Sequence, residues 1–116
     1  MDKEIKIIAD HYGYEPQSRQ LIEEMAELTV ALNKLWRFEQ LIRNKNLDEL
    51  PIEEMITLTA KESECLKQIY SEIADVDIML TQIKHLLGCQ EEVDTVKRQK
   101  VLRQLTRIQG EVDKHE

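Results

Sequence analysis

The chain has 116 residues, enough for one domain with a single hydrophobic core. Its formal net charge of −7 argues against non-specific binding to nucleic acid or acidic membranes, which needs a basic face. Phosphorylated small molecules are not excluded, because carboxylates that hold a divalent metal can bind phosphate through that metal. No apolar run approaches the ~20 residues of a membrane span, and Cys65 and Cys89 make neither a disulfide framework nor a Cys-x-x-Cys motif. We therefore expect a cytoplasmic protein with reduced thiols.

The first half of the chain predicts two helices. A short helix is expected from about Lys3 to Asp10, and it is broken at Gly13, because glycine permits unusual turn angles. A second helix is expected from about Pro16 to Arg43, since proline suits the first helical position and apolar residues then recur at helical spacing. Residues 44–51 form the following loop.

The second half is also helical in pattern. Residues 52–87 contain no glycine or proline and predict either one long helix or two helices with a break near 57–63. Gly88 is expected to cap the end of this segment, and a last helix begins at about Glu91. The expected fold is a single all-α domain over residues 1–116, an antiparallel bundle of four to five helices.

Acidic residues interrupt the apolar rows of the two longest helices. Residues three or four apart share a helix face, and two such rows each contain one glutamate. The rows are Leu21, Glu24, Leu28, Ala31, Leu35 and Ile69, Glu72, Val76, Met79, Ile83. A carboxylate in a core-facing row is costly to bury unless it is paired or bound to metal. Two such rows therefore predict a site.

Four acids form the candidate site: Glu24 and Glu27 on one helix, and Glu72 and Asp75 on the other. Hard oxygen ligands suit Mg²⁺, with Mn²⁺ as a substitute, rather than zinc or copper. A di-iron bundle would need Glu-x-x-His pairs, and no histidine falls in either motif. The alternative is a solvated helix face with local ion pairs, and periodicity alone leaves both interpretations open.

The motifs Glu23-Glu24-x-x-Glu27-Leu28 and Glu72-Ile73-Ala74-Asp75-Val76 resemble the signature of the MazG-like all-α nucleoside triphosphate pyrophosphohydrolases, the superfamily that includes the dimeric dUTPases and dCTPases. The likeness extends to Tyr12-Gly13-Tyr14 with Gln17, to Ala31-x-Asn33-Lys34 and to Lys100-x-x-Arg103. The spacing differs, because 44 residues separate Glu27 from Glu72, more than is usual in that family. The extra segment, roughly Glu39 to Cys65, must extend the helices or form an added element.

The resemblance implies hydrolysis of a nucleoside triphosphate between its α and β phosphates, giving a nucleoside monophosphate and pyrophosphate. It implies that the four acids are the catalytic and Mg²⁺-binding residues, with the general base, the number of metal ions, the base and the sugar left open. Lys100 and Arg103 match a segment that family members use around the phosphates. Lys34 and Asn33 can reach a triphosphate or form a solvated polar edge.

Other residues have weaker assignments. Gln17 can read a base edge, and Trp36 can stack on a base, although Trp36 continues an apolar row and favours core or interface packing. Glu23 is either a supporting residue or part of an exposed ion pair. His11 and His85 have no paired acid nearby in sequence, which favours surface or cap roles.

The exposed apolar helix surface of such a small bundle predicts a homodimer or a homotetramer, with the substrate pocket completed by a neighbouring subunit. The competing hypothesis for function is a non-catalytic helical interaction module that keeps the acids as structural or regulatory metal ligands.

Overall fold

The computed structural model describes residues 1–115 and is all-α, with no strand in that range. The elements are α1 (Asp2–Tyr12), α2 (Tyr14–Arg43), the short 3₁₀ turn η1 (Leu47–Glu49), α3 (Ile52–Leu87) and α4 (Gln90–His115). The all-α prediction is confirmed, and the expected helix ends differ from these bounds by no more than two residues. Residues 52–87 form one unbroken helix rather than two.

Two glycines with positive φ separate the helices. Gly13 has a φ of 87° between α1 and α2, and its N–H donates to the Ala9 carbonyl at 2.8 Å. Gly88 ends α3 in the left-handed conformation (φ 62°, ψ 35°), where its N–H donates to the His85 carbonyl and that of Cys89 to the Lys84 carbonyl. This geometry favours glycine because side chains are strained at positive φ. The predicted cap at Gly88 is confirmed.

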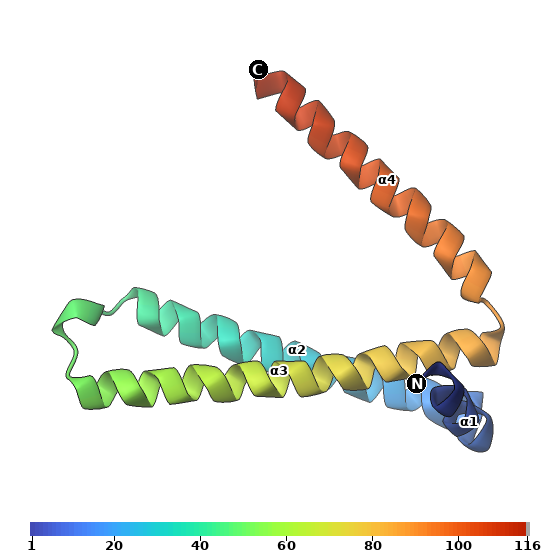
Figure 1. Ribbon diagram of the computed structural model, residues 1–116, viewed down its shortest axis with the longest axis horizontal. Helices are drawn as coiled ribbons and strands as arrows, with labels where there is room; N and C mark the ends of the chain where they lie inside the picture. The colour runs from blue at the N-terminus through green and yellow to red at the C-terminus, as the bar shows by residue number, and fades with distance from the viewer. Residues whose placement is uncertain (116) are drawn as a thin grey trace.

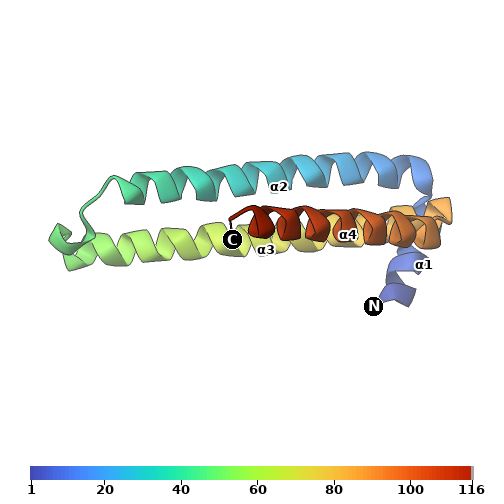
Figure 2. The ribbon, with the colours of Figure 1, turned by 90° about the horizontal axis from the view of Figure 1, so that it is seen from above.

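The long helices α2 and α3 form an antiparallel hairpin (Figures 1 and 2). The two inward rows expected from the sequence face each other, and all of their members, Glu24 and Glu72 included, are buried or half-buried. Phe38 continues the buried row of α2 toward the loop. The extra residues between the two acidic motifs therefore lengthen α2 and α3 and add only η1 at the far end of the hairpin.

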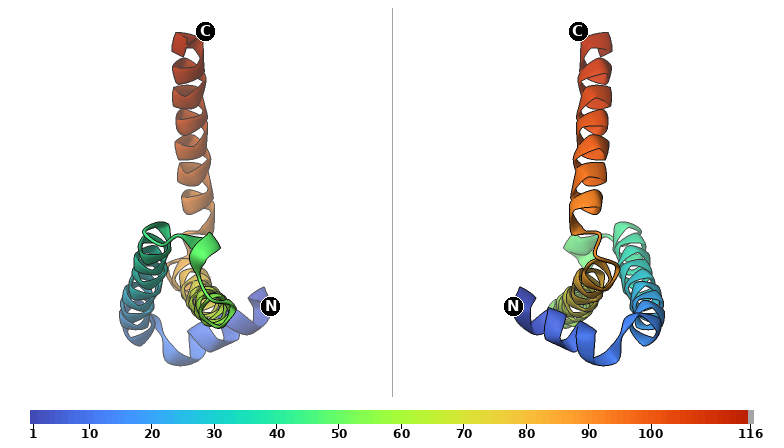
Figure 3. Two further views of the ribbon diagram at one scale, coloured as in Figure 1. Left: turned by 90° about the vertical axis from the view of Figure 1, so that its left-hand side faces the viewer. Right: turned by 90° about the vertical axis from the view of Figure 1, so that its right-hand side faces the viewer.

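Helix α1 crosses the other end of the hairpin (Figure 3), where Ala9 is completely buried. His85 Nε2 lies 2.7 Å from Asp10 Oδ1 and joins α1 to α3. Sequence spacing could not reveal this contact, because Asp10 is 75 positions away from His85 in sequence and adjacent only in the fold.

Helix α4 turns away from the hairpin at Gly88 and runs into solvent (Figures 1 and 3). Every described residue of α4 is exposed, including Val101, Leu105 and Ile108. The radius of gyration is 20.2 Å, against ~13 Å for a compact domain of this length. A bundle of α1 to α3 is thus present in one chain, and α4 stands apart from it. No helix within residues 1–115 has both the length and the apolar character needed to cross a membrane.

Candidate metal centre

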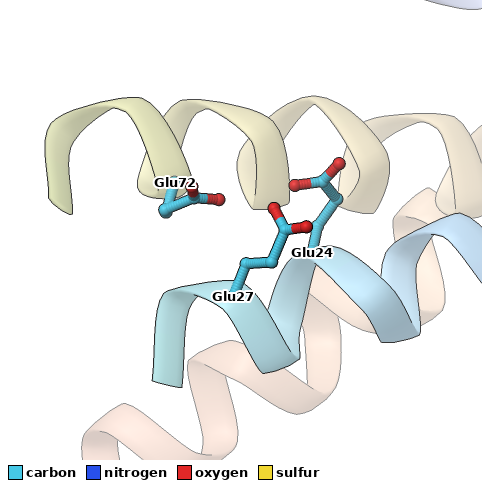
Figure 4. A group of neighbouring side chains, drawn as sticks. All are labelled: Glu24, Glu27 and Glu72. Atoms are coloured by element: carbon cyan, nitrogen blue, oxygen red, sulfur yellow. The ribbon is translucent and has the colours of Figure 1, made fainter. Parts of the chain in front are cut away.

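Three glutamates meet between the two helices of the hairpin (Figure 4). Glu24 and Glu27 come from successive turns of α2, and Glu72 reaches toward them from α3. One carboxylate oxygen of each lies within 4.8 Å of those of the other two. The antiparallel register of the hairpin thus brings together acids that are 45 or more positions apart in sequence.

A glutamine orients each of the two inward glutamates. Gln20 Nε2 donates to Glu24 Oε1 at 2.8 Å, and Gln68 Nε2 donates to Glu72 Oε1 at 2.5 Å. Both glutamines precede their glutamate by four residues, one helical turn. Neither glutamine was predicted from the sequence, although the Gln-x-x-x-Glu spacing recurs on both helices.

The second oxygens of the same two carboxylates are buried and unsatisfied. Glu24 Oε2 and Glu72 Oε2 have no hydrogen-bond partner in the described part of the chain, and Glu72 is only 6% exposed. Buried carboxylate oxygens are rarely left unpaired because the loss of hydration is costly. None of the ion pairs of residues 1–115 involves Glu24, Glu27 or Glu72. The two oxygens are thus chemically suited to accept a cation.

Mutual repulsion perturbs the acids of the site. The negative charges of Glu24 and then Glu72 raise the pKa of Glu27 above its ordinary value. Burial, followed by the charges of Glu24 and Glu72, raises the pKa of Asp75. Asp75 is thus close enough to feel the cluster, but its oxygens are not part of the group within 4.8 Å. The structure brings three of the four predicted ligands into one cluster and places the fourth beside it.

The donor set fits a hard divalent cation. All of the clustered ligand atoms are carboxylate oxygens, with no histidine or cysteine among them. Oxygen-only sites suit Mg²⁺ and Mn²⁺. Because Glu27 is exposed while Glu72 is buried, the cluster is closed on the helix side and open to solvent on the other.

No family model, curated protein or solved structure matches this chain. The resemblance to the MazG-like superfamily therefore rests on the motif residues themselves.

A cavity of about 960 Å³ adjoins the cluster and extends along the hairpin toward η1. Glu27 and Glu72 line it, as does Lys34, which is thereby the predicted phosphate-binding residue placed closest to the acids. Phe38 and Ala31 contribute an apolar wall. Two further cations line this cavity, Arg37 and Lys61, and neither was predicted from the sequence.

The remaining predicted phosphate residues lie elsewhere. Lys100 and Arg103 are exposed on α4, and within one chain they are not brought to the acidic cluster. Lys100 instead lines a separate groove on α4 with Val96 and Lys97. Their part in phosphate binding stays a prediction.

The residues predicted to contact the base have mixed positions. Gln17 Nε2 donates to Gln82 Oε1 at 2.7 Å, a hydrogen bond that joins α2 to α3, and Gln82 is only 2% exposed. Asn33 is exposed and does not line the cavity. Trp36 is 62% exposed, so core packing within one chain is wrong for this residue, and interface packing remains. Glu23 is exposed and outside the cluster.

Proposed function

We propose that this chain is a Mg²⁺-dependent nucleoside triphosphate pyrophosphohydrolase, which converts a ribo- or deoxyribonucleoside triphosphate into the monophosphate and pyrophosphate. The observation that carries the proposal is the pair of buried, unpartnered oxygens of Glu24 and Glu72 beside the carboxylate of Glu27. Such a group is costly to fold without a cation. The motif resemblance supplies the reaction, and the adjoining cavity supplies room for a substrate of nucleotide size.

In this proposal Glu24, Glu27 and Glu72 hold the metal, and Asp75 lies beside them. A metal held by these carboxylates would supply positive charge beside the α–β anhydride, where negative charge develops during the reaction. Gln20 and Gln68 fix the orientation of the two inward carboxylates through their amide groups. Glu27 is the exposed member and also lines the cavity, so it faces the side from which a substrate enters.

We further propose that the working form is a homodimer, on the basis of uncovered apolar surface. The outer stripe of α2 is Ile22, Met25, Leu32 and Trp36, and the outer stripe of α3 is Tyr70, Ile73, Leu80 and Leu87. Each residue of an outer stripe comes one position after an inward position of the same helix. One position corresponds to a rotation of ~100° about the helix axis. Because α2 and α3 are antiparallel, the same rotation places both stripes on one side of the hairpin. Two hairpins can pack through this face as a four-helix bundle.

The exposed area supports a second copy as the occupant. The accessible surface is 9364 Å², whereas a compact chain of this mass exposes ~6,600 Å². The excess is comparable with the ~1,000–2,500 Å² that each subunit buries in an obligate dimer. Lys34 and Arg37 lie on the opposite side of α2 from Leu32, so such packing leaves the cavity open.

The catalytic proposal is tested with purified protein and a panel of nucleoside triphosphates, with and without Mg²⁺, while released pyrophosphate is measured. We expect Mg²⁺-dependent release that falls by about 100-fold or more in Glu72→Gln, because a charged ligand is lost. Glu62→Gln is the matched control, since Glu62 lies on the same helix but is exposed and outside the cluster; it should retain activity.

Two outcomes contradict the assignment in different ways. Full activity in Glu72→Gln would show that the reaction occurs elsewhere in the protein. Tight Mg²⁺ binding without turnover of any triphosphate would favour the non-catalytic module with a structural or regulatory metal.

A further inference from the structure

The cavity beside the acidic cluster changes charge along its length. Its inner end has the carboxylates of Glu27 and Glu72. Three cations line the remainder: Lys34 and Arg37 from α2, and Lys61 from α3. This stretch belongs to the long segment between the two acidic motifs, and the lengthened hairpin thus builds a second charged region next to the first.

These cations, Lys34, Arg37 and Lys61, form no ion pair with an acid of residues 1–115. Lys61 Nζ instead lies 5.9 Å from the centre of the Phe38 ring, a cation–π contact across the hairpin. Phe38 is itself buried, so the ring gives the ammonium group a fixed support.

The reach of the cations matches a phosphate chain that begins at the acidic cluster. At ~1.5 Å per residue, Lys34 and Arg37 lie ~10 and ~15 Å along α2 from Glu27. Side chains on a helix lean toward its N-terminus, so both of these cations lean toward Glu27. Lys61 lies on the antiparallel helix α3, so its side chain leans away from the acidic cluster and borders the outer end of the cavity.

We propose that Lys34, Arg37 and Lys61 form a phosphate subsite that binds the leaving pyrophosphate half of the substrate. The inference rests on the proposed function, in which a metal on the acidic cluster holds the scissile anhydride. Arg37 offers a planar fork of donors for two phosphate oxygens, and the lysines act as point charges. The nucleoside half then lies on the side of the cluster away from η1, toward α1.

One acid opposes this subsite. Glu64 lies on the same wall as Lys61, one helical turn further along α3, and it also lines the cavity. Its charge repels a bound phosphate, so its removal should strengthen binding. A variant that only disrupted the cavity would weaken phosphate binding, so tighter binding after removal of the Glu64 charge cannot come from a loss of structure.

The test measures binding of imidodiphosphate, a pyrophosphate analogue that resists hydrolysis, by calorimetry in the presence of Mg²⁺. The double variant Arg37→Met/Lys61→Met removes both charges and keeps apolar bulk. We expect it to bind the analogue roughly 10- to 100-fold more weakly, because hydrogen bonds between charged groups are lost. Glu64→Gln should bind several-fold more tightly.

The matched control is Arg43→Met/Lys67→Met, which removes two exposed cations from the same helices outside the cavity. It should leave the affinity within about twofold of the wild type, since exposed charges at a distance are screened. Circular dichroism of each variant checks that the helices are intact.

The subsite and the catalytic proposal can fail separately, because the binding measurement needs no turnover. Binding of imidodiphosphate that depends on Arg37 and Lys61, without hydrolysis of any triphosphate, would support the subsite and reject the catalytic proposal. The subsite itself is rejected if the wild type does not bind imidodiphosphate at millimolar concentration. It is also rejected if the cavity and control variants lose affinity equally.

Discussion

The α2–α3 hairpin and helix α4 are both amphipathic, but each is incomplete in a different respect. In the hairpin the inward apolar rows are covered, and the inward groups that lack a partner are carboxylates. In α4 the apolar stripe Val101, Leu105, Ile108 and Val112 is uncovered, and residues 96–108 contain five cations and no acid. Burial of acids points to a cation as the missing partner, whereas exposure of an apolar stripe points to another helix.

The largest expected effect concerns the outer apolar stripes of the hairpin, which form the face of the proposed dimer. We expect Ile73→Asp/Leu80→Asp to raise the dissociation constant of the proposed dimer by about 100-fold or more, because central apolar contacts contribute ~2 kcal/mol each. Analytical ultracentrifugation measures the change, and the emission of Trp36 should shift to the red if its interface opens. Thr57→Asp/Ala60→Asp adds the same charge at exposed positions on the opposite side of α3 and should have little effect.

A monomeric wild type would reject the dimer. Equal weakening by the two double variants would mean that added negative charge, rather than loss of the stripe, separates the subunits.

The next effect concerns the acids of the hairpin without metal. Glu72→Gln should raise the free energy of unfolding of the metal-free protein by about 1–2 kcal/mol, or roughly 4–8 °C in Tm. The substitution removes a buried charge, and the new amide can donate a hydrogen bond to a neighbouring carboxylate. Thermal melting in chelator measures the change, with Glu62→Gln as the control. A lower Tm for Glu72→Gln would contradict the interpretation that the buried carboxylate is unsatisfied.

The hairpin also shows which features a sequence can predict. The inward rows, the position of Glu24 and Glu72 in them, and the cap at Gly88 follow from local spacing and backbone preference, and all were predicted correctly. The contacts of Gln68 and Lys61 differ in how far they can be predicted from local sequence. Gln68 contacts its glutamate one turn away, so its spacing was a readable signal. Lys61 meets Phe38 only through the register of the hairpin, which the length of the connecting loop determines and local periodicity does not reveal.

The smallest effect is a pH dependence that separates the site from the rest of the hairpin. The pKa values of Glu27 and Asp75 are raised in the folded protein above their ordinary values of 4.5 and 3.8. A raised acid pKa means that its stabilising contribution is complete below the ordinary value and is lost as pH rises through the raised value. The metal-free protein should therefore lose part of its stability as the pH rises above 4.5. Mg²⁺ should restore this stability at pH 7 but not at pH 4.5, where protons compete for the ligands. Melting temperatures at both pH values, with and without Mg²⁺, measure this difference.

Glu27→Gln should reduce the pH dependence of the melting temperature, because it removes one of the two perturbed carboxylates. An equal Mg²⁺ effect at both pH values would place the metal away from these carboxylates.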